Sequence, residues 1–275
     1  FVAGGVTHCA AKQTGLKEGT PVVMGGGDGL CSNVGAGSVC PGRTFSCIGT
    51  SAWIATTSEK PLFDEQMRTF TWAHIVPGLY SPTGTMQSAG SSYSWLKQQV
   101  AKWETSEGKA RGCSPYDLIN SEAAKSPIGS NGVTFLPYLL GERAPRWNPD
   151  ATAAWLGVKM ENERCDLFRA VLEGVTLNLN IILNVLRQGG SIDELLLIGG
   201  GANGALWRQM MADVYGVRIR VPKLLNEATS MGAAITGGVG VGIFKDFTVI
   251  DELLEINAVV EPDAERHRAY QVVKE

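Results

Sequence analysis

The sequence predicts an α/β fold, and two observations carry this prediction. In the second half of the chain, short apolar runs typical of strands alternate with runs of helical periodicity, in the order β-α-β-α. Three strand-like runs also lead into glycine-rich turns, at residues 25–27, 49–51 and 199–203. Glycine allows a ligand to approach the backbone closely, and α/β proteins bind ligands at the carboxyl ends of their strands.

The first part of the chain is predicted to be rich in strands. A strand over residues 22–24 leads into three glycines and then Asp28. Residues 44–49 and 53–57 predict a pair of strands joined by a turn at Thr50 and Ser51.

Helices are predicted next. Apolar residues at helical spacing indicate a helix over residues 92–103. A second helix is expected over residues 115–125, because Ser114 is a favourable cap and a proline follows it at the first helical position. The segment 143–151 is expected to be a loop, because its prolines would remove hydrogen-bond donors from a helix.

The β-α-β-α region follows a long amphipathic helix predicted over residues 165–186. Its strand, helix, strand and helix are predicted at residues 195–198, 205–215, 217–221 and 229–237. A final helix over residues 263–273 is expected to pack on the surface.

Composition excludes several classes of protein. A net charge of −3 with only 19% charged residues provides no basic surface for nucleic acid or for an anionic membrane. The chain has no run of about 18 uninterrupted apolar residues, which argues against a membrane span. The six cysteines show no CxxC spacing and no cluster with the three isolated histidines, so we expect reduced thiols, no metal site and a cytoplasmic protein.

Asp28 is the candidate catalytic residue. A carboxylate that follows a strand and a glycine turn can accept a proton from a substrate hydroxyl. The alternative is that Asp28 caps a helix over residues 30–34, and the two roles are compatible.

The other glycine turns predict a phosphate-rich ligand. Residues 199–204 formally match the dinucleotide pattern G-x-G-x-x-G, but the following strand ends in Val221-Pro222-Lys223 without the acidic residue that binds the ribose. Thr50 and Ser51 can bind phosphate oxygens through hydroxyl and amide groups, or they can simply complete a hairpin turn. Three such turns in one chain favour a shared polyphosphate ligand.

Taken in order, the motifs resemble the carboxyl-terminal half of the FGGY carbohydrate kinases, and most of all the xylulokinases. The segments that carry the resemblance cover nearly the whole chain and lie at residues 19–28, 49–51, 73–78, 86–90, 136–145, 169–175, 199–203, 207 and 212–213. The resemblance implies an actin-like ATPase (ribonuclease H-like) domain, with a mixed sheet flanked by helices, and implies ATP and Mg²⁺ as cofactors.

The resemblance also implies roles for individual residues. Asp28 is the general base on a sugar hydroxyl. The residues expected at the ATP phosphates and nucleoside are Gly49, Thr50, Ser51, Gly90, Gly200, Gly201 and Asn203. The implied reaction is ATP-dependent phosphorylation of a ketopentose, D-xylulose to D-xylulose 5-phosphate.

Two departures from the family pattern are present. Gly29 occupies the position that is typically Asn in xylulokinases, which affects a sugar or water contact. The family's amino-terminal actin-like domain, with its Asp-x-Gly-Thr turn, is not found in this sequence, which opens on Phe1 without an initiator Met. Residues 1–275 are therefore expected to form a carboxyl-terminal domain whose partner is that missing domain, and to be inactive alone.

Other functions remain open at this level. The chain could be a non-catalytic nucleotide-binding or assembly module of the actin-like superfamily, or a kinase for another sugar or polyol. A base after Gly27 favours the kinase, since a binding module does not need one. A homodimer is among the assemblies that the sequence allows.

Overall fold

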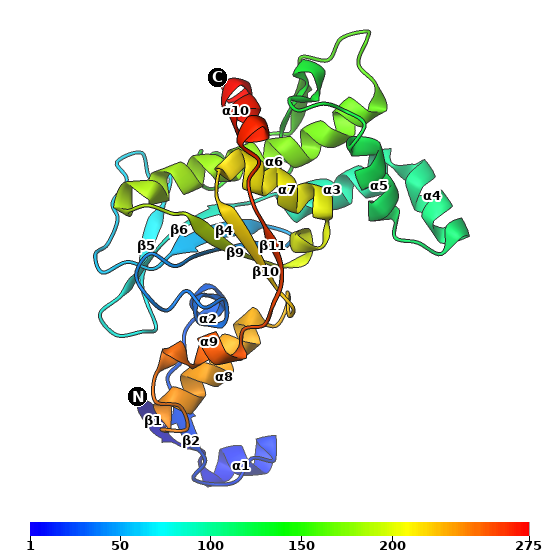
Figure 1. Cartoon of the computed structure of the whole chain (residues 1–275). Helices are drawn as coiled ribbons and strands as arrows, with labels where there is room; N and C mark the ends of the chain where they lie inside the picture. Colours follow the sequence, from blue (N-terminus) through cyan, green and yellow to red (C-terminus); the bar gives the residue numbers. More distant parts are fainter. Residues whose placement is uncertain (275) are drawn as a thin grey trace.

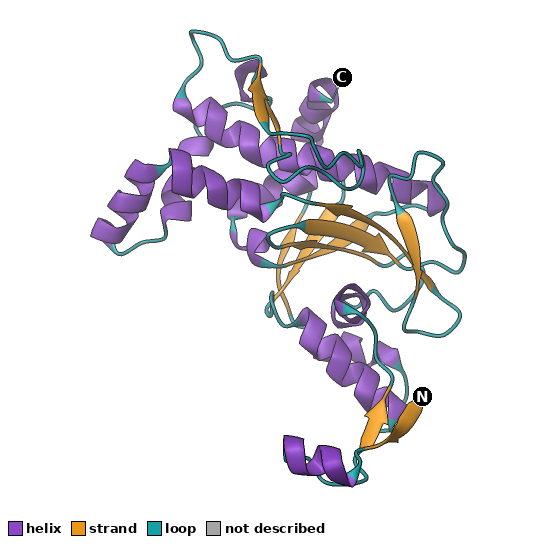
Figure 2. Ribbon diagram, turned by 180° about the vertical axis from the view of Figure 1, so that it is seen from behind, coloured by secondary structure: helices purple, strands orange, loops and turns teal. Residues whose placement is uncertain are grey.

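The computed structural model describes residues 1–274 and shows a mixed seven-stranded sheet covered by helices on both faces (Figures 1 and 2). The strands are β1 (Val2–Gly5), β2 (Pro21–Val23), β3 (Thr44–Ile48), β4 (Ala52–Thr56), β5 (Phe70–Ala73), β6 (Tyr80–Met86), β7 (Thr134–Leu136), β8 (Ala154–Leu156), β9 (Glu194–Ile198), β10 (Arg218–Pro222) and β11 (Ile256–Val260). The α-helices are α1 (His8–Thr14), α2 (Asp28–Gly35), α3 (Gly90–Trp95), α4 (Lys102–Arg111), α5 (Pro115–Ala123), α6 (Arg164–Leu186), α7 (Ala205–Tyr215), α8 (Ala228–Gly240), α9 (Ile250–Leu253) and α10 (Ala264–Val273).

The main sheet has the order β11-β10-β9-β3-β4-β6-β5. Strands β3, β9 and β10 are parallel, whereas β4 runs antiparallel to both β3 and β6. The direction of β6 is therefore that of β3 and β9. All three strands end at the same edge of the sheet, and each is followed by one of the glycine-containing turns.

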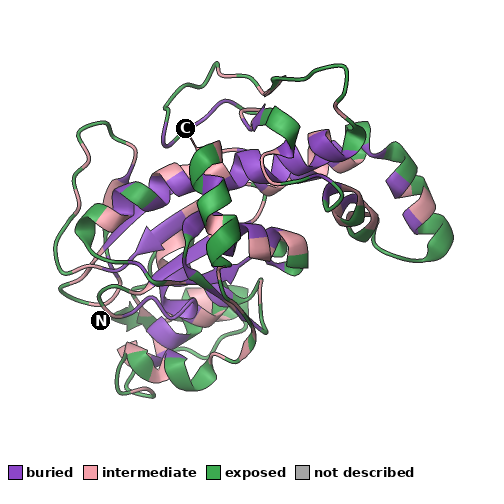
Figure 3. Ribbon diagram, turned by 45° about the horizontal axis from the view of Figure 1, so that its top comes forward, coloured by how far each residue is buried: buried purple, intermediate pink, exposed green. Residues whose placement is uncertain are grey.

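Helix α6 forms the centre of the core on one face of the sheet. Its buried side includes Phe168, Leu172 and Leu179, which pack with strands and with α7 (Figure 3). Its length and apolar composition would suffice to cross a membrane, but 83% of its most apolar window is buried inside the protein. The apolar character of α6 is explained by core packing.

Helices α2 and α8 pack on the opposite face of the sheet and cross each other at very short range. A Cβ atom built on Gly35 would lie 1.7 Å from the Ala228 carbonyl oxygen, and one on Gly232 would lie 1.9 Å from the Cys31 carbonyl oxygen. The Ser32 and Thr229 hydroxyls hydrogen-bond across this contact at 2.7 Å. Because glycine leaves room for backbone contact, the crossing fixes the position of α2.

Most predicted elements are confirmed, and one helix prediction needs correction. The helix expected over residues 92–103 is α3 followed by a π-helical turn at Leu96–Val100, where the Ala101 amide donates to the Leu96 carbonyl, and a separate α4 begins afterwards. The final helix, α10, packs on the surface as expected, and a single buried side chain anchors it to the core. Its Tyr270 is buried, and the hydroxyl lies 2.8 Å from Arg169 and 2.9 Å from Glu173 of α6.

The strand before Asp28 lies outside the main sheet. Strand β2 pairs with β1 alone, and this two-stranded ribbon with α1 extends from the body below α8 (Figure 1). Its residues Val2, Val22 and Met24 are exposed. The premise that Asp28 follows a strand of the main sheet is therefore wrong, and the position of Asp28 depends on the packing of α2.

Candidate functional site

Two of the three predicted glycine turns, at residues 49–51 and 199–203, meet at one edge of the sheet together with the turn at Gly90. The third predicted turn, at residues 25–27, precedes α2 and contributes Gly27 to a different cavity, so the expectation of one ligand shared by all three is not met. The Gly90 amide donates to the Gly49 carbonyl at 3.0 Å, and the Ser91 amide donates to the Thr50 carbonyl at 3.0 Å. Gly199 has a φ of +85°, and a Cβ atom there would lie 2.6 Å from the Ile48 carbonyl. Parallel β3 and β9 and the co-directional β6 explain the convergence, because their carboxyl ends coincide.

A cavity of about 620 Å³ opens between these turns. Six of the seven residues predicted to bind nucleotide line it: Gly49, Thr50, Gly90, Gly200, Gly201 and Asn203. Sequence reasoning assigned no ligand contact to the other lining residues, which are Ile48, Tyr93, Ser94, Ser114, Tyr116, Asp117, Asn120, Gly204 and Trp207. Helical spacing around Tyr93 and the cap at Ser114 located α3 and α5, but neither signal indicates that the two helices face a shared cavity.

These additional lining residues provide aromatic and polar groups suited to a heterocyclic base. The Tyr93 and Tyr116 rings lie 4.9 Å apart, and the Lys97 ammonium is 4.6 Å from the Tyr116 ring centre. Burial raises the pKa of Tyr93, which keeps its hydroxyl protonated, and it donates to Asn120 Oδ1 at 2.6 Å. The cavity is therefore lined by aromatic and polar side chains as well as by the backbone of the glycine turns.

Two neighbouring glycines have different roles in this cavity. A Cβ atom on Gly201 would lie 2.5 Å from the Ile48 side chain, so its small size is required for packing against β3. A Cβ atom on Gly200 would meet no atom within 4 Å. Both residues line the cavity, but only at Gly200 does a side chain have free space to enter it.

Asp28 is the first residue of α2, and Gly27 occupies the cap position. Its Oδ1 accepts a hydrogen bond from the Gly29 amide at 2.8 Å, and the carboxylate is exposed. A negative charge at this end of a helix is favoured by the helix dipole. Asp28 therefore serves as a cap only in part. It is the first residue of the helix and not the residue before it, and within the described residues it accepts a hydrogen bond only from the amide of the next residue.

Asp28 lines a second cavity, of about 410 Å³. Its other lining residues are Gly27, Gly29, Leu30, Asn33, Ser51, Trp53, Ala55, Phe70, Trp72, Thr83, Thr85, Met86 and Arg143. Ser51 lies here, whereas Thr50 lines the cavity between the glycine turns. Consecutive residues of the β3–β4 turn therefore contact two different cavities.

A buried carboxylate, Glu142, holds the backbone of Arg143, which lines the same cavity as Asp28. Glu142 Oε1 accepts hydrogen bonds from the Gln87 amide at 2.7 Å and the Arg143 amide at 2.8 Å, and Oε2 accepts from Asn178 Nδ2 at 3.1 Å. Burial raises the pKa of Glu142, and these hydrogen bonds oppose the shift. Glu142 thereby joins the end of β6, the loop at Arg143 and helix α6.

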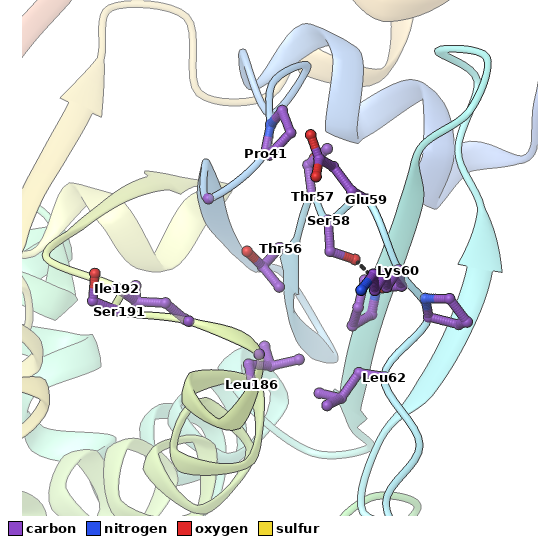
Figure 4. Close-up of a pocket in the computed structure, with 15 residues that line it drawn as sticks. Pro41, Thr56, Thr57, Ser58, Glu59, Lys60, Leu62, Leu186, Ser191 and Ile192 are labelled. Atoms are coloured by element: carbon purple, nitrogen blue, oxygen red, sulfur yellow. Dashed lines mark hydrogen bonds between the residues drawn. The ribbon is translucent and has the colours of Figure 1, made fainter.

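A third cavity, of about 390 Å³, lies at the opposite end of β3 and β4 (Figure 4). Two hydroxyls on its wall are already engaged, because Thr57 donates to the Ser38 carbonyl and Ser58 to the Lys60 carbonyl, and the Ser191 side chain is exposed to solvent. Its charged residues, Glu59 and Lys60, are exposed at the rim. These features give it no group that requires a ligand.

The charged groups of the site suit a magnesium ion that arrives with phosphates. Within residues 1–274, the structure holds no cluster of three or more His, Cys, Asp or Glu side chains that could bind a metal alone. Mg²⁺ typically keeps several waters and binds one or two carboxylates together with substrate phosphates. A single carboxylate, Asp28, in the same cavity as Ser51 of the β3–β4 turn would match this requirement.

Comparison with known proteins gives a consistent result. The FGGY family of carbohydrate kinases, C-terminal domain, matches residues 45–241. A xylulose kinase of Staphylococcus epidermidis is 33% identical over 270 residues, which cover 98% of this chain and 52% of that protein. A gluconokinase of Bacillus subtilis is 34% identical over 256 residues, which cover 90% of this chain and 49% of that protein.

The structure of a xylulose kinase from Rhodospirillum rubrum superposes with a TM-score of 0.85 at 30% identity, covering 99% of this chain and 53% of that one. This likeness confirms the actin-like ATPase fold with a mixed sheet flanked by helices. The chain spans about half the length of the curated relatives it matches. By the family match and by these relatives, the chain belongs to the FGGY family of carbohydrate kinases.

Proposed function

We propose that this chain is the carboxyl-terminal, nucleotide-binding half of an ATP-dependent kinase that phosphorylates a ketopentose, D-xylulose, to D-xylulose 5-phosphate. One observation carries the proposal: Thr50 and Ser51 line adjoining cavities, one between the glycine turns and the other containing Asp28. The first cavity suits the nucleotide and the second suits the acceptor sugar. The terminal phosphoryl group then passes between them at this turn.

Asp28 acts as the general base in this proposal. Its carboxylate accepts the proton of the sugar hydroxyl while the hydroxyl oxygen attacks the terminal phosphorus of ATP, and ADP leaves. Phosphoryl transfer depends mainly on positioning and on charge stabilisation, which backbone amides can supply without a P-loop lysine. In the Gly49–Ser51 turn the Gly49 amide already donates to the Ser51 carbonyl at 2.9 Å, so the amides of Thr50 and Ser51 are the ones assigned this role.

ATP fits the larger cavity by its chemistry. Phosphates would lie against Gly49, Thr50 and Gly200, with the base toward the tyrosine pair. Bound Mg²⁺ would neutralise part of the phosphate charge. Six free cysteines agree with a protein of the reducing cytoplasm, and we propose that location.

A sugar panel tests the proposed function. We expect the full-length protein that carries this chain to release ADP with D-xylulose, and the isolated 275-residue chain to release none, because the second phosphate turn and most sugar contacts of the family lie outside it. The measurement is coupled ADP release with ketopentoses, polyols, hexuloses and gluconate. Gluconate belongs in the panel because a gluconokinase is as similar to this chain as the xylulose kinase.

Each outcome of the panel has a defined meaning. Turnover of gluconate but not of D-xylulose would reject the proposed substrate and keep the reaction. Sugar-dependent ADP release by the isolated chain would reject the divided active site. ATP binding by the full-length protein without turnover of any sugar would favour the non-catalytic module.

A valine at position 200 tests the assignment of the nucleotide cavity. Gly200→Val introduces a branched side chain where a Cβ atom has no neighbour within 4 Å, so the fold is retained while the space beside the phosphates is filled. We expect ATP affinity to fall by about 10-fold or more, equivalent to at least about 1.4 kcal/mol. Calorimetric titration of the full-length protein with ATP measures this change.

Gly189→Val is the matched control. A Cβ atom on Gly189 also meets nothing within 4 Å, and Gly189 lines the remote cavity instead. We expect this variant to bind ATP as the wild type does. Equal ATP affinities for both variants would show that the nucleotide lies elsewhere.

A further inference from the structure

We propose that Arg143 binds the phosphoryl group as it arrives on the acceptor side of the β3–β4 turn. The inference rests on the proposed function and assigns a role to a residue that the sequence analysis placed in a loop and in the family-like segment 136–145, without giving it a function. Arg143 lines the same cavity as Asp28 and Ser51. A cation, a base and a phosphate-binding turn therefore surround one space.

In the described part of the chain the Arg143 guanidinium forms no side-chain hydrogen bond, although its charge partly offsets the raised pKa of the neighbouring Glu142. Within residues 1–274 it forms no ion pair with a carboxylate, whereas Arg43, Arg68 and Arg169 pair with Asp251, Asp64 and Glu173. An arginine stays protonated in proteins, and its planar group matches phosphate oxygens in a bidentate manner. Arg143 is therefore available to an anionic ligand.

The backbone beneath Arg143 is fixed. Its amide donates to the buried Glu142 carboxylate at 2.8 Å, and the Glu142 amide donates to the Asn148 carbonyl at 2.9 Å. Ala144, the next residue, is completely buried. The rigid backbone fixes where the exposed Arg143 side chain begins, so binding a ligand has to order only the rotamers of that side chain.

A second donor on the cavity wall supports an oxygen-rich ligand. The indole nitrogen of Trp53 is buried, and within the described part of the chain it has no hydrogen-bond partner. Buried donors are usually paired, so an unpaired one beside a cavity points to a ligand that supplies the acceptor. Arg143 and Trp53 both offer N–H groups, and phosphoryl oxygens accept them.

The proposed role concerns charge during transfer. The sugar oxygen forms a bond to the terminal phosphorus, the bond from that phosphorus to the bridging oxygen of ADP breaks, and Asp28 takes the hydroxyl proton. The phosphoryl oxygens keep their negative charge throughout and move from the nucleotide side to the acceptor side. Arg143 stabilises them there, so it contacts the product's phosphate group and not the sugar before transfer.

The test compares Arg143→Gln, Arg143→Lys and Arg146→Gln in the full-length protein. We expect Arg143→Gln to lower kcat by roughly 10²- to 10³-fold, as loss of one electrostatic stabiliser typically does, with sugar KM nearly unchanged. Arg143→Lys should recover part of this loss. Arg146 is a matched control, because it is an exposed arginine three residues away that lies outside the lining of the Asp28 cavity.

A binding measurement separates this role from a structural one. By calorimetry, we expect Arg143→Gln to weaken affinity for D-xylulose 5-phosphate by about 10-fold or more and to leave affinity for D-xylulose unchanged. Equal weakening of both ligands, a raised sugar KM alone, or kcat equal to that of Arg146→Gln would overturn the inference. If wild type turns over a sugar while Arg143→Gln is unaffected, only the inference fails; if wild type turns over none, the proposed function fails and the inference with it.

Discussion

Replacing Asp28 by Asn in the full-length protein is expected to lower kcat by roughly 10²- to 10⁴-fold, equivalent to about 3 to 5 kcal/mol of transition-state stabilisation. Asn retains the shape of the side chain and removes the base. Sugar affinity should change little, because an amide still hydrogen-bonds a hydroxyl, so the loss appears in kcat. Steady-state kinetics with the sugar identified in the panel measures this loss.

A melting curve and a second variant control for indirect effects. Asn serves about as well as Asp at a helix start, so the melting temperature of Asp28→Asn should match that of the wild type. Asp150→Asn changes an exposed carboxylate outside both cavities and should keep wild-type turnover. Normal turnover by a folded Asp28→Asn protein would mean that Asp28 is only a helix-terminal residue, and the mechanism would need another base.

Gly35→Ala is expected to be the most destabilising single substitution proposed here. The new methyl group would lie 1.7 Å from the Ala228 carbonyl oxygen, so α2 and α8 must separate. Overpacking typically costs 1–3 kcal/mol, and a rigid backbone neighbour places this case at about 3 kcal/mol or more. That loss corresponds to a fall of roughly 6–12 °C in melting temperature.

Gly29→Ala is the matched control in the same helix. A Cβ atom on Gly29 meets nothing within 4 Å, and alanine favours a helix over glycine by about 1 kcal/mol, so stability should be retained or increased. Thermal unfolding of the two variants measures the difference. A Gly35→Ala protein as stable as Gly29→Ala would show that the helices can separate without cost, and that the crossing does not fix Asp28.

The strands and helices that the sequence predicted have local signals, whereas six of the eleven strands in the described residues, β1, β5, β6, β7, β8 and β11, were not predicted. Turn residues delimited β3, β4, β9 and β10, and apolar periodicity located α6 and α7, since each signal depends on neighbours along the chain. The π-helical turn after α3 was not predicted, because apolar spacing continues through it. The anchoring of α10 was also missed, because Tyr270 bonds to Arg169 and Glu173 about one hundred residues earlier.

The sequence by itself determined the element order, the three glycine turns, the family and the candidate base Asp28. Only the tertiary structure decided how these parts combine. In the structure β2 lies outside the main sheet, Thr50 and Ser51 line different cavities, and Arg143 lines the cavity that contains Asp28. The physical reason is that secondary structure follows local backbone preferences, whereas a cavity is formed by side chains that meet only when distant strands pair and helices pack.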